Sequence, residues 1–250
     1  MELSGQRAWI TGASSGIGTA TAKILASYGA EVVLSARREE RLYKIAQEIA
    51  TVGSKAVVKV VNVSDKRAMA ALGQELEEMG GIDILINNAG IMPLAPMLER
   101  RVDEWESIVD VNIKGVLYAV NAVLAGMSQR RNGHIVNVSS LGGRVTFPGA
   151  AVYCGSKFAV RAISDTLRKE AIQYGVRVTD IQPGAVDTEL VNSINYAPVR
   201  EAITSKGGFW GPDAENLRAE DVAKAIFYAL SQPKHVDVSE ILLRPRMQEI

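Results

Sequence analysis

The stretch TGASSGIG at residues 11–18 decides the fold, because it joins a short apolar strand, RAWIT (7–11), to the start of a helix through closely spaced glycines. Gly12 permits a tight turn, Gly16 lets the backbone approach a pyrophosphate, and Gly18 lets the helix pack close to the strand. A helix N-terminus attracts phosphate. A glycine-rich turn alone is a weak signal, but this context predicts a dinucleotide-binding loop. The expected contacts are Gly12, Ser14, Ser15, Gly16, Ile17 and Gly18.

Strand-like and helix-like segments alternate along the rest of the chain. β-Branched runs of strand length occur at 31–36, 56–61, 82–87, 134–140, 177–182 and 240–244, and helical periodicity occurs at 20–29, 39–53 and 66–80. Such alternation requires right-handed crossovers between parallel strands. With the first strand, the pattern predicts an α/β protein: a single-domain Rossmann fold over residues 1–250, built on a doubly wound, seven-stranded parallel sheet with helices on both faces.

Composition and charge limit the classes of function. The 28 basic and 28 acidic side chains balance, so no excess positive field favours nucleic acid or an anionic membrane surface. No consecutive apolar run reaches the roughly 18 residues that a spanning helix needs. A single cysteine, Cys154, and the absence of a signal-like start predict a cytoplasmic location. His134 and His235 are scattered, so the sequence specifies no metal site.

Residues 188–218 interrupt the alternation. The segment is polar, rich in glycine and proline, and follows the carboxyl end of the strand at 177–182. Long ordered insertions at such places are usually functional, so we expect a substrate-binding lid. Its aromatic residues, Tyr196, Phe209 and Trp210, either line an apolar pocket or form the lid's own small core.

The end of the second strand indicates the type of dinucleotide. NAD-binding proteins place an acid there to bind the ribose 2′-hydroxyl, but this chain has Ala36. Arg37 and Arg38 follow, and guanidinium groups suit a 2′-phosphate. We therefore expect NADP(H), with Arg37 as the main contact. Arg38 has a second interpretation: it belongs to the charged first turn of the next helix and does not contact the cofactor.

Several motifs, in this order, resemble the short-chain dehydrogenase/reductase family over nearly the whole chain. They are TGASSGIG (11–18), NVSD (62–65), NNAG (87–90), VNIKG (111–115), VSS (138–140), YCGSK (153–157) and PGAVDT (183–188). Many members carry aspartate in place of Asn62, which can still bond to adenine, and some NADP-preferring members carry a basic residue in place of Ser15. The resemblance is strongest to NADP-dependent carbonyl reductases and to hydroxy-acid or clavulanate-type dehydrogenases.

The resemblance implies an NADPH-dependent carbonyl reductase, reversible as an alcohol dehydrogenase, acting on a small carbonyl or alcohol and forming homodimers or homotetramers. Its further cofactor contacts would be Asn62, Val63, Asn88, Ala89, Gly90, Tyr153, Lys157, Pro183, Gly184, Val186 and Thr188. The catalytic set would be Asn112, Ser140, Tyr153 and Lys157. The expected substrate contacts are Ser140, Leu141, Tyr153, Tyr196, Phe209 and Trp210.

Tyr153 and Lys157 suit ketone reduction, in which nicotinamide C4 supplies hydride and the protein supplies a proton. The reference pKa of tyrosine, about 10, is high for proton transfer at neutral pH. Lys157 lies four residues later on the same helix face, so its charge is expected to lower the pKa of Tyr153. The resemblance implies that Lys157 also bonds the nicotinamide ribose.

Four other residues have competing interpretations. Ser140 is expected to stabilise charge on the substrate oxygen, with Ser139 as competitor on the opposite side of the strand. Asn112 is similar to the family residue that holds a water in a proton relay to Lys157; otherwise it faces a neighbouring helix. Asp187 is either a substrate-loop acid or a helix cap. Cys154 is expected to pack in the core, with redox chemistry as the alternative.

Two other classes of function share this fold. One is a cofactor-binding regulator that has lost its chemistry, and the other is an epimerase or dehydratase. A regulator would be expected to lack Ser140, Tyr153 or Lys157, and all three are present. The sequence therefore favours the reductase.

Overall fold

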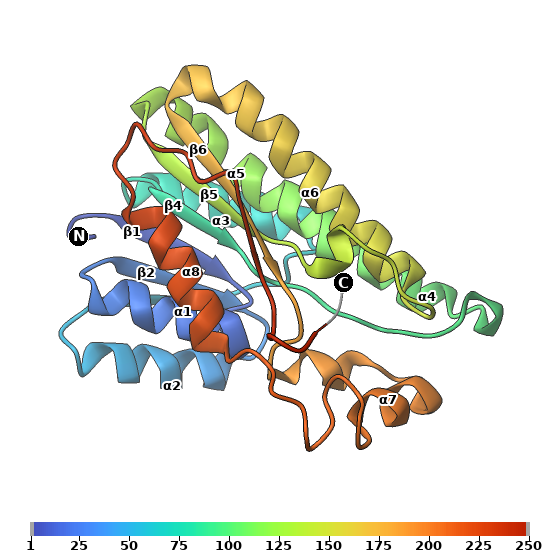
Figure 1. The fold of residues 1–250 in the computed structure, drawn as a ribbon. Helices are drawn as coiled ribbons and strands as arrows, with labels where there is room; N and C mark the ends of the chain where they lie inside the picture. The colour runs from blue at the N-terminus through green and yellow to red at the C-terminus, as the bar shows by residue number, and fades with distance from the viewer. Residues whose placement is uncertain (1–2, 249–250) are drawn as a thin grey trace.

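A computed structural model describes residues 3–248. In that range seven parallel strands form one sheet in the order β3-β2-β1-β4-β5-β6-β7 (Figure 1). The strands are β1 (Arg7–Thr11), β2 (Glu31–Ala36), β3 (Ala56–Val60), β4 (Ile84–Asn87), β5 (Gly133–Val138), β6 (Val176–Pro183) and β7 (Glu240–Leu243). The predicted doubly wound sheet in a single Rossmann domain is confirmed.

The strand order reverses beside β1, and this reversal positions the site. β1 pairs with β2 on one side and with β4 on the other, so the chain runs outward to β3 and then crosses back. The loops after β1 and β4 therefore separate at the carboxyl edge of the sheet. Open α/β sheets bind ligands at this switch point.

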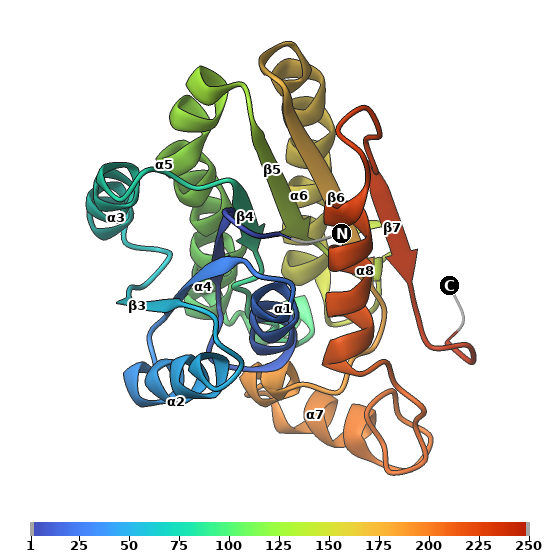
Figure 2. The same cartoon turned by 90° about the vertical axis from the view of Figure 1, so that its left-hand side faces the viewer.

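Helices cover both faces of the sheet, as Figures 1 and 2 show. One layer holds α1 (Gly16–Ser27), α2 (Glu39–Ala50) and α8 (Ala219–Ser231); the other holds α3 (Lys66–Glu78), α4 (Val102–Ile108), α5 (Gly115–Arg130) and α6 (Ala151–Ala171). Strand residues alternate between the layers: in β1, Ile10 packs with the first layer's core and Trp9 with the second's. Both residues are fully buried, so the register of β1 is fixed from both sides.

A π-helical segment, η2 (Val109–Lys114), joins α4 to α5 and makes one helix of 29 residues, Val102–Arg130. By length and composition this helix could cross a membrane, although it has no long uninterrupted apolar run. In the fold it lies against α3, α6 and the sheet, where Val120, Val123 and Met127 are buried. A helix that packs on a sheet needs the same apolar composition.

The segment between β6 and α8 stands beyond the carboxyl ends of the strands (Figure 1). It contains a 3₁₀ turn, η5 (Glu189–Ser193), and one short helix, α7 (Ala197–Thr204). A single parallel bridge between Val186 and Leu217 ties its two ends together. Its apolar residues, among them Ile194, pack against Met92 and Tyr153, so this insertion sits directly on the switch-point region.

Candidate active site

The phosphate loop has the geometry that its glycines predicted. Gly16 has φ of +53°, and a Cβ there would lie 2.9 Å from the Thr188 methyl group. A Cβ on Gly18 would lie 2.5 Å from the Gly12 carbonyl oxygen, so only glycine allows α1 to begin this close to β1. The backbone N–H groups at the start of α1 therefore face the edge of the sheet, where they can bind an anion.

Arg38 connects this loop to the insertion after β6. Its Nε donates to Ser14 Oγ at 3.0 Å and its Nη2 to Ser15 Oγ at 2.6 Å. Its Nη1 donates to Glu189 at 2.6 Å. Arg41 also pairs with Glu189 at 2.7 Å, and these bonds hold the pKa of Glu189 below its usual range.

Arg37 is differently placed. It lines the same cavity, and within residues 3–248 its side chain makes no hydrogen bond or ion pair. A free guanidinium at the end of β2 is available to a 2′-phosphate, which matches the role expected for it.

The NNAG segment serves first as a scaffold. Thr11 Oγ1 accepts hydrogen bonds from the backbone N–H groups of Asn88 and Ala89 at 3.0 and 3.1 Å. The Asn88 amide donates to the carbonyls of Thr11 and Gly12, while Asn87 donates to Asn137. Asn88 therefore fixes the phosphate loop to β4, and Thr11, a residue that the sequence argument did not single out, organises both.

One cavity of about 630 Å³ runs along the carboxyl edge of the sheet. Of the predicted site residues, it is lined by Gly12, Ser14, Ser15, Gly16, Ile17, Arg37, Arg38, Asn62, Val63, Asn88, Ala89, Gly90, Ser140, Leu141, Tyr153, Lys157, Pro183, Gly184, Val186, Thr188, Phe209 and Trp210. Gly18, Asn112 and Tyr196 lie outside its lining. The phosphate loop thus shares one continuous space with Ser140, Tyr153 and Lys157, whereas Asn112 lies outside it.

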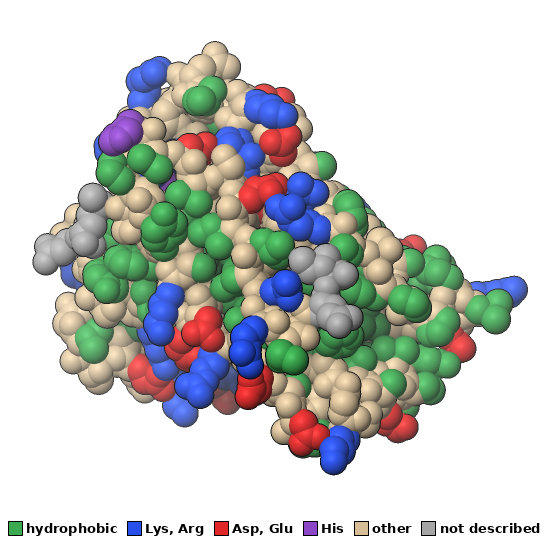
Figure 3. Space-filling model, in the orientation of Figure 1, with side chains coloured by type: hydrophobic (Ala, Val, Ile, Leu, Met, Phe, Trp, Pro, Cys, Tyr) green, Lys and Arg blue, Asp and Glu red, His purple; other side chains and the backbone are tan. Residues whose placement is uncertain are grey.

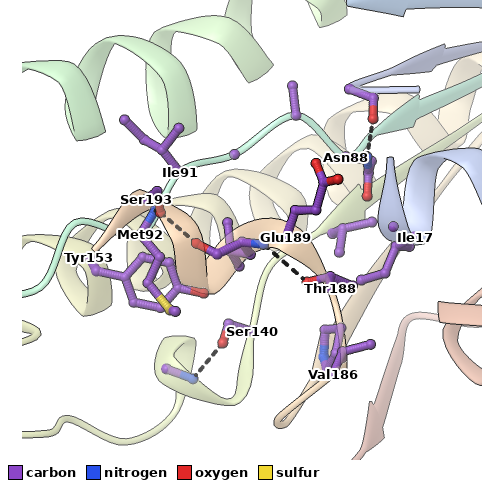
Figure 4. Close-up of a pocket in the computed structure, with 18 of the residues that line it drawn as sticks. Ile17, Asn88, Ile91, Met92, Ser140, Tyr153, Val186, Thr188, Glu189 and Ser193 are labelled. Atoms are coloured by element: carbon purple, nitrogen blue, oxygen red, sulfur yellow. Dashed lines mark hydrogen bonds between the residues drawn. The ribbon is translucent and has the colours of Figure 1, made fainter. Parts of the chain in front are cut away.

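Ser140 and Tyr153 meet in this cavity, where Figure 4 shows both side chains. A Cβ on Gly142 would lie 3.4 Å from Ser140 Oγ and 3.3 Å from the Tyr153 ring. The Gly142 N–H donates to Ser140 Oγ at 3.0 Å, which leaves the hydroxyl proton for another acceptor. The competitor, Ser139, is buried and donates to the Ile181 carbonyl at 3.3 Å, so the two serines diverge beyond the end of β5.

Lys157 and Asn112 both lie close to Gly90. A Cβ added to Gly90 would be 3.4 Å from Asn112 Oδ1 and 3.7 Å from Lys157 Nζ. Asn112 lies in the π-helical turn η2, and its amide bonds to both backbone groups of Ile91 and to Ser156. Single π-turns often occur at functional sites. This turn brings a helix residue up to the strand edge, and the sequence pattern did not indicate it.

The expectation that Lys157 lowers the pKa of Tyr153 is wrong in this structure. Burial raises the pKa of Tyr153 to about 12, opposed by its hydrogen bond with Ser140. Burial also lowers the pKa of Lys157 to about 8, opposed by Asp180. Lys157 Nζ lies 5.8 Å from the Tyr153 ring centroid and donates to the Val138 carbonyl at 2.9 Å. Desolvation therefore sets the direction of both pKa shifts.

Two residues of the insertion have roles other than those expected. The Tyr196 hydroxyl donates to Glu99 at 3.0 Å and points away from the cavity. Asp187 is neither a cavity residue nor a cap: its carboxylate accepts a hydrogen bond from Asn216 at 2.9 Å. The cap of η5 is Thr188, which accepts from the Leu190 N–H at 3.4 Å.

A buried acid behind Lys157 was missed by the sequence argument. Asp180 in β6 is fully buried and accepts a hydrogen bond from Gln182 at 2.6 Å. Burial raises its pKa. The signal was present, since an aspartate in the middle of a buried strand needs a partner.

Charges and possible ligands of metals are dispersed over the described chain. Figure 3 shows basic and acidic side chains interspersed on the face it presents. Residues 3–248 contain no group of three or more histidine, cysteine or acidic side chains that could hold a metal ion. Cys154 is buried, and burial raises the pKa of its thiol.

Comparison with known proteins adds to this geometry. A family model described as short chain dehydrogenase matches residues 6–198. An uncharacterised oxidoreductase of Staphylococcus saprophyticus is 41% identical over 243 residues, 96% of each chain. A glycine betaine reductase of Emericella nidulans is 44% identical over 249 residues, which are 99% of this chain but 19% of that longer protein.

Solved structures share the fold over almost the whole chain. The closed form of serine dehydrogenase complexed with NADP+ has a TM-score of 0.89 and 32% identity, with 98% of this chain and 97% of that chain covered. An alcohol dehydrogenase from the archaeon Thermococcus sibiricus, complexed with 5-hydroxy-NADP, has a TM-score of 0.86 and 29% identity, with 98% of each chain covered.

Proposed function

Because the chain belongs to the short-chain dehydrogenase family and is an oxidoreductase of that type, we propose that it reduces a ketone or aldehyde to an alcohol with NADPH, reversibly. One observation carries the proposal: the hydroxyls of Ser140 and Tyr153 share a cavity with the phosphate loop and the free guanidinium of Arg37. That arrangement joins a proton donor to a dinucleotide site.

The residues of the cavity fit NADP(H). The start of α1 and the close approach allowed by Gly16 suit a pyrophosphate. Arg37 would bind the 2′-phosphate, with Arg38 beside it, and Asn62 lines the cavity where adenine would lie. The relatives solved with NADP+ or 5-hydroxy-NADP support the same choice. When bound, the nicotinamide supplies the hydride.

The chain's own groups would handle the oxygen of the substrate. Ser140 would donate its hydroxyl proton to that oxygen and stabilise the negative charge that grows there. Tyr153, protonated at neutral pH because burial raises its pKa to about 12, gives the proton that completes the alcohol. Lys157 would hold the nicotinamide ribose, and Asn112, which also lies close to Gly90, would support Lys157 there.

The direct test is NADPH oxidation with a panel of ketones and aldehydes, for the wild type and for Tyr153→Phe. We expect turnover by the wild type, a loss of about a hundredfold or more in Tyr153→Phe, and NADPH affinity within about twofold of the wild type. A wild type that binds NADPH tightly but turns over no carbonyl compound would contradict the reductase and favour a cofactor-binding regulator.

We also propose that the protein is a cytoplasmic homodimer or homotetramer. Exposed hydrophobic side chains, Leu117 on α5 and Phe158 on α6, support assembly through these helices. Light scattering coupled to gel filtration measures the mass in solution. A monomer at micromolar concentration would contradict the assembly.

A further inference from the structure

The end of the cavity beyond Tyr153 is walled by hydrophobic side chains. It is formed by the segment before α4, the turn before α6 and the insertion after β6, which contribute Met92, Leu94, Phe147, Leu190, Val199 and Ile203. Several of these pack in one cluster with Tyr153 and Trp210. Figure 4 shows Met92 beside the Tyr153 ring, and Figure 3 shows hydrophobic side chains gathered around α7 on the outer face.

The other polar atoms at this end already have partners. The Trp210 indole N–H donates to the Val186 carbonyl at 3.0 Å. Ser193 donates its hydroxyl proton to the Leu190 carbonyl at 2.7 Å and accepts from the Met92 N–H at 2.8 Å. The hydroxyls of Ser140 and Tyr153, which bond to each other, are therefore the side-chain groups at this end that a substrate can reach, and both serve the reacting oxygen.

Charged groups line only the opposite part of the cavity. Among the described lining residues they are Arg37, Arg38, Lys157 and Glu189. Glu189 is paired with two arginines and Arg38 bonds the phosphate-loop serines. Lys157 bonds the Val138 carbonyl and lies behind Tyr153. None of these stands at the hydrophobic end to neutralise a charged substituent.

We infer that the substrate is a neutral ketone or aldehyde whose substituents are hydrophobic. This inference rests on the proposed function and names its substrate class. It separates the chain from dehydrogenases of hydroxy acids, because a carboxylate at the hydrophobic end would lose water without gaining a cationic partner. A quaternary ammonium aldehyde would likewise meet no unpaired acid, since Glu189 is the only acid lining the described cavity and is already paired. The aromatic rings of Phe147 and Trp210 are the groups that could attract such a cation, and the trimethylammonium ketone below tests that attraction.

Three ketones of equal length test this substrate class. Each is a methyl ketone with a three-methylene spacer, ending in tert-butyl, in trimethylammonium or in carboxylate. The first two have the same shape and differ only in charge. With saturating NADPH, kcat/KM for the tert-butyl ketone should exceed that for each charged ketone at least about tenfold, because an unpartnered charge is rejected strongly.

Calorimetry with the corresponding primary amides, which cannot be reduced, measures the same selectivity as binding to the NADP+-saturated protein. If the neutral amide binds best but no ketone is turned over, the proposed reaction fails, whereas the preference of the hydrophobic end for neutral ligands stands. Equal or better binding and turnover of the carboxylate or the ammonium compound would overturn the substrate class while leaving the reaction intact.

Val199→Arg supplies the cation that the wild type lacks at this end. Val199 is half-buried in α7, and its methyl group would lie 3.8 Å from a Cβ on Gly149. We expect Val199→Arg to raise the carboxylate-to-neutral ratio of kcat/KM at least about tenfold. Ala202→Arg adds the same charge at an exposed position of α7 and should leave the ratio within about twofold. If the carboxylate-to-neutral ratio rose equally in both variants, Val199 could not be assigned to the wall that contacts the substrate.

Discussion

Arg38 and Glu189 are 151 residues apart in sequence, yet Arg38 Nη1 lies 2.6 Å from the Glu189 carboxylate. This ion pair joins the loop after β2 to the insertion after β6 across the phosphate loop. Since Arg41 bonds the same carboxylate, Glu189 neutralises part of the positive charge that would attract a 2′-phosphate. We therefore expect Glu189 to weaken NADPH binding, although its bonds to Arg38 and Arg41 fix the position of the insertion.

Glu189→Gln should tighten NADPH binding. The neutral amide frees the charges of Arg38 and Arg41, and we expect the dissociation constant for NADPH to fall about twofold to fivefold, as for an exposed ion pair. NADH, which lacks the 2′-phosphate, should respond less. Fluorescence titration measures both constants, and Glu201→Gln, an exposed acid of α7, is the control. Weaker NADPH binding in Glu189→Gln would show that the ion pair helps to hold the cofactor.

Arg37→Ala should cost NADPH binding far more than NADH binding. A hydrogen bond to a charged group contributes about 1.5–3 kcal/mol, so KM for NADPH should rise roughly tenfold to a hundredfold while KM for NADH changes little. Arg200→Ala removes an exposed arginine of α7 and should change neither. Equal losses for both cofactors would refute contact with the 2′-phosphate.

The fold could be predicted from the sequence because the central strands β1, β2, β4 and β5 are short, apolar and buried between two helix layers. β2 has the predicted bounds, 31–36. The first helix begins at Gly16, four residues earlier than the periodicity indicated, because the glycine loop itself forms its first turn. The periodicity of apolar residues indicates which side chains face the core and does not detect where the backbone begins to turn. The predicted start of the first helix was therefore too late.

The site could be predicted only where a motif fixes the backbone. The positions of Ser140 and Tyr153 follow from the end of β5 and from α6. Asp187 and Tyr196 bond to Asn216 and Glu99, which are distant partners that no local pattern specifies. The pKa of Tyr153 depends on burial from all sides, and spacing on one helix contains no information about that burial.

Deprotonation of Lys157 should produce a descending limb in the pH profile of kcat/KM for NADPH. Burial lowers its pKa to about 8, so the free protein has the charged side chain below that pH and loses it above. Since kcat/KM for NADPH reports the free enzyme, it should fall above pH of about 8. The raised pKa of Tyr153 keeps the phenol protonated throughout this range.

Lys157→Arg tests the assignment of that limb. The guanidinium stays charged, so the descending limb should move to higher pH even if the maximal rate is lower. Lys169→Arg, at an exposed position of the same helix, should leave the profile unchanged. A limb that stays in place in Lys157→Arg would assign it to another group.

His134 should make folding sensitive to acid. Its Nε2 lies 2.8 Å from Thr179 Oγ1, and that hydroxyl donates to the Val238 carbonyl at 2.7 Å, so Nε2 must be the donor to Thr179. Nδ1 is buried without a partner in the described chain. A second proton would therefore have no acceptor. Burial lowers the pKa of His134 to about 3, with a further contribution from Arg177.

The direction of this pH dependence follows from proton binding in the folded and unfolded states. The unfolded chain takes up a proton at His134 below its ordinary pKa of about 6.5, whereas the folded protein resists uptake down to about pH 3. The folded protein therefore keeps its full stability relative to the unfolded chain above pH of about 6.5. Below that pH, proton uptake by the unfolded chain lowers the free energy of unfolding. Between pH 7 and pH 5 the free energy of unfolding should fall by about 2 kcal/mol from this residue alone.

Urea unfolding of His134→Gln at the two pH values measures the effect. Glutamine can still donate to Thr179 but does not titrate, so the variant should lose about 2 kcal/mol less than the wild type between pH 7 and pH 5. Each protein is compared with itself, which removes any general destabilisation by the substitution. His235→Gln, at an exposed position, should keep the wild-type dependence. The same dependence in His134→Gln would mean that other groups govern the loss of stability in acid, and that the folded protein accommodates a charged His134.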